Sequence, residues 1–385
     1  MNILLLAPHP FYQERGTPIA VDLLLRVLAE RGEQVDVLTY HEGEDRAYPG
    51  PGAVRLFRIP PPPACRNIRP GFSLKKLAAD AAMHRMALRM ARRKKYDLVH
   101  AVEESVFMAM RIARRHGTPY VYDMDSSMSR QIADKLPPAR ALLPLMRACE
   151  RRAVRGAAAV AAVCDSLADQ ARADGAKRVV ILRDVPLLTS ADAGSGSRGF
   201  RDALGIRGPA LLYIGNLESY QGIDLLIESF ARVPRDLGAQ LVIVGGAPPH
   251  VARCQALARK LGAADAIHLI GPRPVADMAA LMAEADILVS PRIHGTNTPM
   301  KIYSYMASGK AVLATDLPTH TQVLEAETAC LAPPDPDAFA AAMTSLIRKP
   351  DTRARLGAAA RRAVETRYSL DVFRRTLNSL YDALP

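Results

Sequence analysis

The stretch SPRIHGTNTPMKIYSYMASGK (residues 290–310) starts at the end of an apolar run, continues as a polar turn and ends in a segment of helical period. Its composition predicts a helix with Thr298 as the cap, Pro299 as the first helical residue and Lys301 in the first turn. The free amides of a helix N-terminus bind anions, and Arg292 and Lys301 add positive charge on either side. The stretch therefore predicts an anion site built on a strand, a turn and a helix.

Working outward, short apolar runs alternate with segments of helical period, which is typical of parallel sheets covered by helices. A segment rich in Gly and Ser, residues 189–200, separates two sets of such runs and is predicted to be a linker. The sequence therefore predicts an α/β protein with two Rossmann-like parallel-sheet domains facing each other across a cleft. The predicted parts are an N-terminal domain (1–183), a linker (184–209), a C-terminal domain (210–368) and a final helix (369–385). The apolar runs predicted as strands are 2–7, 34–40, 54–59, 96–102, 120–124, 159–163, 179–182, 210–215, 239–245, 266–271, 286–290 and 311–315.

The composition of the 385 residues excludes several classes of protein. The chain is 49% hydrophobic with a mean hydropathy near zero, as expected for a globular protein, and its longest run of small apolar residues is too short to cross a bilayer. Residues 1–7, MNILLLA, are predicted to form a buried strand rather than a signal peptide. Five scattered cysteines without a CxxC pair favour reduced thiols in a cytoplasmic protein, and argue against a disulfide framework or a zinc site.

Positive charge is concentrated in the first half of the chain. Residues 1–183 hold 30 Lys and Arg against 19 Asp and Glu, whereas the remaining residues are nearly balanced. Residues 72–95 have helical period and are strongly basic, which predicts either a solvated helix or one that docks on an anionic membrane. Docking is the interpretation we favour, which would make the protein peripheral on the membrane. No nucleic-acid partner is expected, because the sequence holds no recognised nucleic-acid motif and no aromatic stacking platform.

Ligands of parallel sheets bind beyond the carboxyl ends of the strands, so the loops that follow the strands hold the candidate residues. Gly16 lies in the first such loop, where a glycine permits close approach to a phosphate, although an ordinary turn glycine is equally consistent. Neither YIGNLESYQG (213–222) nor LVIVGG (241–246) fits the pattern G-x-G-x-x-G, so a dinucleotide cofactor is poorly supported. The candidate binding residues in these two loops are Gly215, Asn216, Gln221 and Gly245.

His100 ends a predicted strand and is followed by Glu103 and Glu104. A histidine at this position binds a phosphate or orients an acceptor hydroxyl in some sites and is purely structural in others, and the sequence leaves both readings open. The DMD run (123–125) resembles a metal-binding DxD, but a carboxylate that caps the next helix explains it better.

Four segments together carry a resemblance that runs along nearly the whole chain. They are ILLLAPHPFYQERGTPIAV (3–21), YIGNLESYQGIDLLIESF (213–230), LVIVGG (241–246) and PMKIYSYMASGKAVLATDLPTHTQVL (299–324). In order and spacing they resemble a glycosyltransferase of GT-B fold, family 4. The resemblance implies transfer of a sugar from a nucleotide-sugar to an acceptor, with retention of anomeric configuration, no essential metal and no cofactor. It also implies donor binding in the C-terminal domain, acceptor binding in the N-terminal one, and a last helix that crosses back to the N-terminal domain.

The sequence departs from the family pattern at the donor site. Relatives usually have two Glu eight positions apart, and alignment on YMASG (305–309) places Thr296 and Ser304 there. A serine can make only part of the bonds that the second Glu makes to ribose hydroxyls. Asn216 and Gln221 stand where many relatives grip the diphosphate with Arg and Lys. Two interpretations follow: a non-catalytic GT-B protein that binds a nucleotide or serves as a scaffold, or a rewired active site, which we favour.

In the rewired site, Arg292 and Lys301 supply the positive charge that stabilises the leaving diphosphate. Gly16 would approach the same diphosphate from the other domain, and Ser304 would keep a weakened ribose contact. His100 would face the acceptor, with Glu103 beside it. A UDP-sugar is the favoured donor, and the acceptor is expected to be lipid-linked or presented at a membrane surface. The backbone amides from Asn297 to Met300 are expected to help hold the diphosphate.

Overall fold

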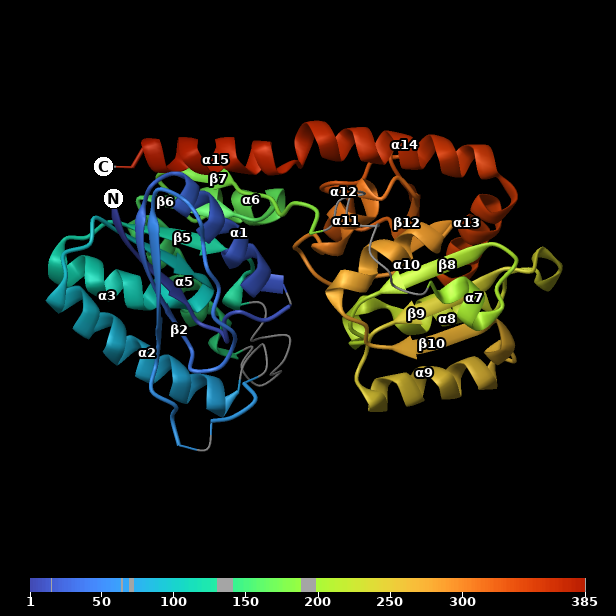
Figure 1. Ribbon diagram of the computed structural model, residues 1–385, viewed down its shortest axis with the longest axis horizontal. Helices are drawn as coiled ribbons and strands as arrows, with labels where there is room; N and C mark the ends of the chain where they lie inside the picture. The colour runs from blue at the N-terminus through green and yellow to red at the C-terminus, as the bar shows by residue number, and fades with distance from the viewer. Residues whose placement is uncertain (15, 64, 69–72, 130–140, 188–198, 385) are drawn as a thin grey trace. The chain divides into compact units, whose positions relative to one another are not determined.

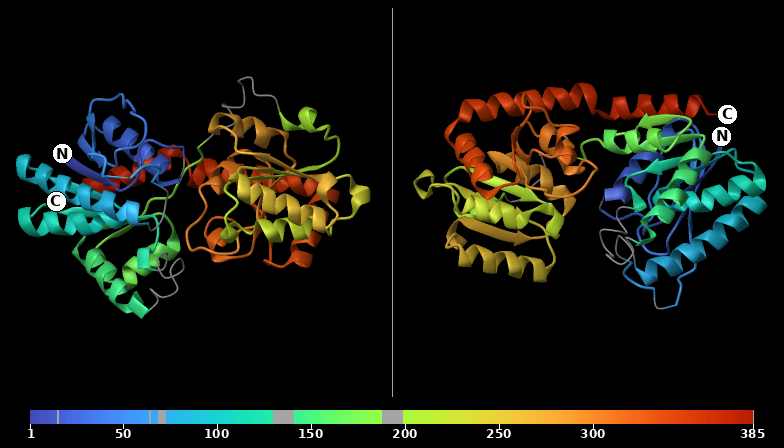
Figure 2. Two further views of the ribbon diagram at one scale, coloured as in Figure 1. Left: turned by 90° about the horizontal axis from the view of Figure 1, so that it is seen from below. Right: turned by 180° about the vertical axis from the view of Figure 1, so that it is seen from behind.

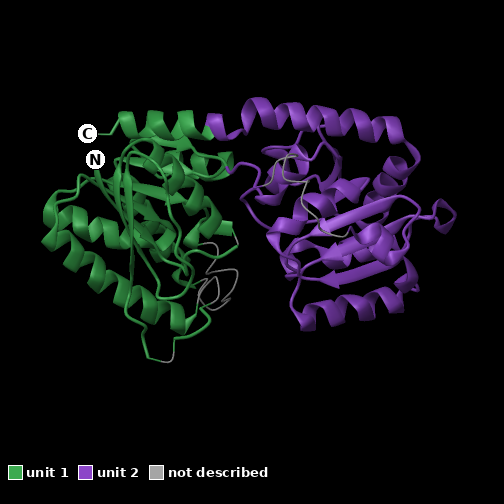
Figure 3. Cartoon of the chain, viewed as in Figure 1, with its two compact units in different colours: residues 1–183, 373–385 green, residues 184–372 purple. Residues whose placement is uncertain are grey.

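The computed structural model describes residues 1–14, 16–63, 65–68, 73–129, 141–187 and 199–384. These residues form two compact units, one made of residues 1–183 and 373–385 and the other of residues 184–372 (Figure 3). Residues 188–198, which include most of the Gly- and Ser-rich stretch 189–200 of the predicted linker, lie outside the described residues. The five cysteines are all free thiols.

The first unit is built on a seven-stranded sheet in which every pair of neighbouring strands is parallel, in the order β3-β2-β1-β4-β5-β6-β7. The central strands are almost fully buried, since helices cover both faces and leave no side for solvent. The strands are β1 (Asn2–Ala7), β2 (Gln34–Thr39), β3 (Ala53–Arg58), β4 (Leu98–Val102), β5 (Tyr120–Met124), β6 (Ala159–Ala162) and β7 (Val179–Ile181).

Helices α2, α3, α5 and α6 share one apolar core with the first sheet, in which small residues such as Ala79, Ala87 and Ala109 allow close helix-to-sheet packing. The last helix also packs on this unit through Tyr381, which is 2% exposed. Figures 1 and 2 show these helices around the sheet. The helices are α1 (Gly16–Glu30), α2 (Leu74–Arg93), α3 (Val106–His116), α5 (Leu143–Gly156), α6 (Asp165–Ala173) and α15 (Leu370–Asp382).

The second unit is built on a six-stranded parallel sheet in the order β10-β9-β8-β11-β12-β13, with an apolar core on each face. The two parallel sheets confirm the predicted α/β fold class. The sequence analysis missed β13, because its three residues are too few to show a pattern. The strands are β8 (Ala210–Ile214), β9 (Gln240–Val244), β10 (Ile267–Gly271), β11 (Ile287–Ser290), β12 (Ala311–Thr315) and β13 (Cys330–Ala332). The helices are α7 (Phe200–Leu204), α8 (Ile223–Phe230), α9 (Pro248–Lys260), α10 (Met278–Glu284), α11 (Lys301–Ala307), α12 (Pro318–Thr321), α13 (Pro336–Arg348) and α14 (Pro350–Arg367).

Candidate functional site

The turn between β11 and α11 differs in one respect from its prediction. Helix α11 begins at Lys301 with Met300 as its N-cap, so Pro299 is not the first helical residue and Thr298 is not the cap. The reason is a tighter turn before the helix, in which the Ile302 amide donates to the Pro299 carbonyl at 2.9 Å. The Thr298 hydroxyl is buried and has no hydrogen-bond partner. A buried hydroxyl without a partner is costly, which makes it a candidate ligand contact.

Lys301 is the central cation of this turn. Its side chain is partly buried, and its Nζ lies 3.3 Å from Oε1 of Gln221 and 4.0 Å from the centre of the Tyr213 ring. Among the described residues, no carboxylate lies within ion-pair distance of this amine. Burial, and secondarily the charge of Arg292, lower the pKa of Lys301 well below its usual value. A buried amine without a counter-charge is a strong site for an anion.

Arg292 shapes the same turn. It is 8% exposed, and its guanidinium donates to the carbonyls of His294 (2.7 Å) and Asn297 (3.3 Å) and to Oδ1 of Asn297 (3.0 Å). The guanidinium also lies 5.3 Å from the centre of the Tyr220 ring. These bonds hold the backbone of the turn in place while they keep a second positive charge close to Lys301.

Two glycines bring the loops after β8 and β9 together. A Cβ on Gly245 would lie 2.1 Å from the carbonyl oxygen of Gly215, which no side chain can tolerate. A Cβ on Gly215 would lie 3.2 Å from Nζ of Lys301, so this glycine leaves the space that the amine occupies. The structure therefore brings three of the predicted residues, Gly215, Gln221 and Gly245, together around the amine of a fourth, Lys301.

The other predicted donor residues occupy the surroundings of this cluster. The carbonyl of Thr296 accepts from Nε2 of Gln322 at 2.8 Å, and Asn216 is exposed with its amide 3.3 Å from the Tyr220 hydroxyl. The hydroxyl of Ser304 accepts a hydrogen bond from the Leu187 amide at 3.2 Å, and its contact with ribose stays a prediction. The serine is thus engaged by the chain that enters the second unit.

The sequence analysis missed His320, which is fully buried beside this turn. Its Nε2 lies 2.9 Å from the Ser290 hydroxyl, and its Nδ1 lies 2.9 Å from the Thr315 hydroxyl. These bonds tie together the carboxyl ends of β11 and β12, and Thr315 in turn donates to the Arg292 carbonyl at 2.6 Å. Burial lowers the pKa of His320 to about 3, so the ring is neutral. The signal in the sequence was a histidine inside the quoted DLPTHTQVL, five residues after the strand that ends at Thr315.

In the first unit, His100 is fully buried at the centre of the sheet. Its Nε2 lies 3.2 Å from Oδ2 of Asp123, and its Nδ1 lies 2.8 Å from the Tyr381 hydroxyl. Both ring nitrogens therefore have protein partners, which favours the structural reading of this histidine. Asp123, from the DMD run, is used in this contact.

Glu103 follows the end of β4 in a left-handed backbone conformation, with φ of 51°, that is unusual for a side-chain-bearing residue. Both of its carboxylate oxygens accept from the Ser126 hydroxyl, at 2.8 and 2.9 Å. Burial, and then the nearby Glu104, raise the pKa of Glu103 to about 8. A carboxyl group with a raised pKa and an unusual backbone conformation, at the carboxyl edge of a sheet, is a candidate functional group.

Two further pairs adjoin Glu103. Lys76, in the first turn of α2, forms an ion pair with Glu104. The Tyr40 hydroxyl donates to Asp80, and burial followed by the charge of Glu104 raises the pKa of Asp80 to about 7. This edge of the first sheet therefore holds several carboxyl groups but a single close ammonium group among the described residues.

Gly16 is the first residue of α1, and a Cβ added there would meet no atom within 4 Å. The space around this glycine is open, so packing does not explain its presence. It belongs to the first unit together with His100 and Glu103, and its approach to a donor diphosphate stays a prediction.

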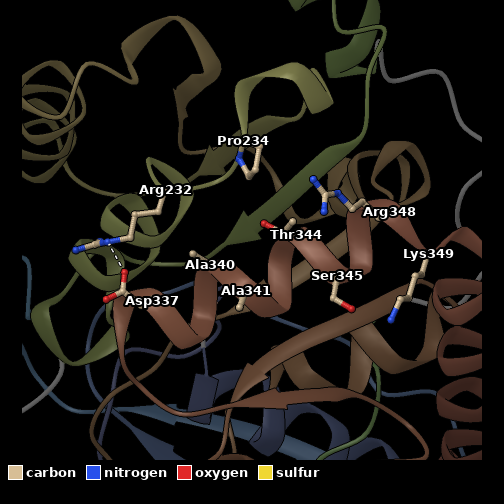
Figure 4. Close-up of a pocket in the computed structure, with 9 residues that line it drawn as sticks. All are labelled: Arg232, Pro234, Asp337, Ala340, Ala341, Thr344, Ser345, Arg348 and Lys349. Carbon is tan, nitrogen blue, oxygen red and sulfur yellow. Dashed lines mark ion pairs between the residues drawn. The ribbon is translucent and has the colours of Figure 1, made fainter.

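A groove of about 530 Å³ on the second unit lies away from the predicted residues (Figure 4). Arg232 and Asp337 form an ion pair of 2.9 Å across it. Arg348 and Lys349 stand at the carboxyl end of α13, where positive charge complements the helix dipole. The remaining lining residues are Pro234, Ala340, Ala341, Thr344 and Ser345. The groove takes no part in the site described above.

Comparison with known proteins identifies the family. A family model described as "Glycosyl transferase 4-like domain" matches residues 15–183, and one described as "Glycosyl transferases group 1" matches residues 208–349. The chain belongs to the group 1 glycosyltransferases of GT-B fold. The resemblance to this family that was seen in the sequence is thereby confirmed.

Curated relatives of this glycosyltransferase family member include the D-inositol 3-phosphate glycosyltransferase of Kineococcus radiotolerans, 27% identical over 94% of this chain and 91% of the relative. Another is the phosphatidyl-myo-inositol mannosyltransferase of Mycobacterium leprae, 30% identical over 181 residues. That match spans 46% of this chain and 47%, about half, of the relative.

Solved structures with the same fold include sucrose-phosphate synthase from Thermosynechococcus elongatus, with a TM-score of 0.79 and 19% identity over 99% of this chain and 98% of that one. Anabaena HepE in complex with UDP gives a TM-score of 0.75 with 17% identity over the whole of both chains. At these identities the likeness shows the fold.

Proposed function

We propose that this glycosyltransferase moves a sugar from a UDP-sugar to an acceptor at a lipid surface, with retention of anomeric configuration and without a catalytic metal. The buried Lys301 amine carries the proposal. It lies at the carboxyl edge of the second sheet, in the strand, turn and helix that resemble the family's donor site, and it has no acidic partner among the described residues. A diphosphate would provide the missing counter-charge.

Lys301 also accounts for the departures from the family pattern. Its amine reaches Gln221, the position where relatives grip the diphosphate with a cation, so the charge would come from α11 instead of the loop after β8. Arg292 adds a second positive charge, and the hydroxyl of Thr298 adds a donor that has no partner among the described residues. Together they would stabilise the leaving diphosphate as the bond to the sugar breaks.

UDP is the nucleotide that we favour, because Anabaena HepE, a protein of the same fold, was solved in complexes with UDP and with UDP-glucose. In the first unit, Glu103 would bind an acceptor hydroxyl. The departing phosphate would take the proton of that hydroxyl, and the sugar would be delivered to the face from which the phosphate leaves.

A lipid-surface acceptor is supported by the name of the Mycobacterium leprae relative, a phosphatidyl-myo-inositol mannosyltransferase. Of the described residues, no helix combines the length and apolar character needed to span a bilayer. The proposal places the acceptor at a membrane surface, to which this protein would bind from the cytoplasmic side.

Calorimetric titration with UDP, GDP and ADP tests the donor site. We expect UDP to bind wild type at least tenfold more tightly than Lys301→Met, whereas Lys260→Met, which removes an exposed lysine at the end of α9, should bind like wild type. Failure of all three nucleotides to bind would overturn the proposal. Tight UDP binding without turnover of UDP-glucose or UDP-galactose, in the presence of phosphatidylinositol vesicles, would favour the second candidate, a nucleotide-binding scaffold.

A further inference from the structure

More than half of the exposed large apolar side chains among the described residues lie on one group of helices in the first unit. Nine large hydrophobic residues are exposed in the described structure, and five of them belong to the starts of three helices, α2, α3 and α5. The five residues, with their exposed fractions, are Leu74 (81%), Leu77 (46%), Phe107 (41%), Leu142 (57%) and Leu145 (63%). Such gathering is unusual, because exposed apolar residues are normally scattered singly.

The same three helices carry an excess of positive charge. Their sequences contain 13 Lys and Arg against two acidic residues, Asp80 and Glu150. Glu150 is buried and Asp80 is bonded to Tyr40, so neither neutralises the outer surface. Nine exposed arginines have no acidic partner among the described residues: Arg85, Arg89, Arg92, Arg93, Arg111, Arg114, Arg115, Arg147 and Arg152.

These helices lie side by side. Helix α3 contacts both α2 and α5, and all three bury their inner sides in one core against the sheet (Figure 1). We use the name three-helix face for their outer surface, made of the five apolar residues and nine arginines given above. Apolar and basic residues occupy different parts of the three-helix face. The apolar residues lie in the first turns of the helices, and most of the arginines lie further along them.

The direction of the helices relative to the strands shows at which edge of the sheet the five apolar residues lie. Each of the three helices runs against the parallel strands, so each begins at the carboxyl edge of the sheet. Glu103 and Glu104 stand at that edge, and Lys76 in the first turn of α2 pairs with Glu104. The exposed leucines therefore lie at the edge of the sheet at which the acceptor is proposed to bind.

We propose that the three-helix face is the docking surface for an anionic bilayer, with the arginines on lipid headgroups and the leucines inserted beside the acceptor edge. The inference deepens the proposed function and rests on it only for the acceptor. Basic residues close to an anionic leaflet are attracted to its headgroups, so several of the nine arginines together favour binding. Inserted leucines add apolar burial that salt does not screen.

The composition of the face favours a bilayer over nucleic acid. The three helices contain one aromatic residue, Phe107, and neither Tyr nor Trp. Proteins that hold single-stranded nucleic acid stack its bases on several aromatic side chains. Leucines in the first turns of helices instead match the acyl boundary of a bilayer.

Vesicle sedimentation of the full chain tests whether the arginines of the three-helix face bind anionic lipid. We expect binding to vesicles of phosphatidylcholine with 30% phosphatidylglycerol at low salt, and little binding to phosphatidylcholine alone. The triple variant Arg85→Gln, Arg89→Gln, Arg111→Gln should bind at least tenfold more weakly. The matched control Arg207→Gln, Arg259→Gln, Lys260→Gln removes the same charge from the second unit and should change binding less than twofold.

Insertion can be read separately, because the chain contains no tryptophan. Leu145→Trp places a single fluorophore at the apolar end, and its emission should shift to the blue with anionic vesicles. Leu261→Trp, at the end of α9 in the second unit, replaces another exposed leucine and should not shift.

Three outcomes would overturn the proposal: no binding to anionic vesicles, equal loss in the face variant and the control, or an unshifted Leu145→Trp spectrum. Tighter binding of a single-stranded RNA that depends on the same three arginines would assign the face to nucleic acid. Titration with UDP needs no vesicles, so UDP binding that persists while vesicle binding fails overturns the docking surface and leaves the donor site standing. The reverse result overturns the donor site alone.

Discussion

The Tyr381 hydroxyl lies 2.8 Å from Nδ1 of His100, which joins the last helix of the chain to a central strand of the first sheet. The two rings are stacked, with centroids 6.1 Å apart and an angle of 10° between their planes. Asp123 lies on the other side of the imidazole, so the three side chains form a buried row. The C-terminal residues are therefore part of the core of the first unit.

Tyr381→Phe tests this row. Removal of the hydroxyl leaves Nδ1 of a buried histidine without its partner, so we expect the free energy of unfolding to fall by about 1–2 kcal/mol. Denaturant unfolding, followed by circular dichroism, measures the change. Arg375→Ala, an exposed substitution on the same helix, should stay within about 0.5 kcal/mol of wild type. Equal stability of Tyr381→Phe and wild type would show that the bond contributes nothing.

The stability of the second unit should depend on pH through His320. Its pKa is lowered to about 3 by burial, whereas in the unfolded chain it lies near 6.5. Between these values the unfolded state binds more protons than the native state, so stability falls as pH drops below 6.5. One such group costs about 1.4 kcal/mol for each pH unit. Unfolding at pH 7, 6, 5 and 4 measures the slope, and His320→Gln should remove most of it. A variant with the same acid slope as wild type would contradict this assignment.

The sequence predicted helices and strands correctly where the local pattern of apolar residues matches the burial of the element. The buried strands β1, β5 and β12 have the bounds predicted for them, because parallel strands covered on both faces are continuous apolar runs. The start of α11 was misplaced, since the tight turn at Pro299 depends on bonds that residue preferences do not encode. The pairing of Lys301 with Gln221 and of Ser304 with Leu187 could not be predicted either, because each joins distant segments through tertiary packing.

The contact between Ser304 and Leu187 gives a direct test of the predicted ribose contact. Ser304→Ala removes the acceptor of the Leu187 amide, so we expect a loss of about 1 kcal/mol in the free energy of unfolding. If the hydroxyl is used for the linker segment instead of ribose, UDP affinity should change less than twofold. Calorimetry and denaturant unfolding on one preparation separate the two effects. A tenfold loss of UDP affinity at unchanged stability would restore the ribose contact.

Nucleotide binding should be linked to proton uptake by Lys301. Burial keeps the pKa of this amine low in the free protein, and a bound diphosphate would raise it by supplying negative charge. Between the two pKa values, binding takes up a proton, so UDP affinity should fall as pH rises through that window. Titration in buffers of different ionisation enthalpy measures the proton directly.

The neighbouring titratable groups each keep one charge state over the pH range in which Lys301 is expected to titrate. Arg292 stays charged, His320 is neutral above pH 5, and Tyr213 and Tyr305 have raised pKa values that keep them neutral. Lys301→Arg keeps a charge at every pH, so its UDP affinity should lose most of the pH dependence while it stays above that of Lys301→Met. Proton uptake by Lys301→Met equal to that of wild type would assign the linkage to another group.

Glu103 should make the first unit less stable in alkaline solution. Its pKa is raised to about 8, whereas the unfolded value is near 4.5, so the native state holds a proton that the unfolded state has lost. Its contribution is fully present below pH 4.5 and is lost as pH rises through 8, at about 1.4 kcal/mol for each pH unit between these values.

Glu103→Gln cannot ionise and keeps a polar group beside Ser126. Its advantage in unfolding free energy over wild type should therefore grow by about 3 kcal/mol from pH 6 to pH 9. Asp80→Asn, which removes a neighbouring carboxyl with a raised pKa, separates the two contributions. A constant difference between Glu103→Gln and wild type over this range would mean that Glu103 ionises normally, and the acceptor site would then have to be built on another group.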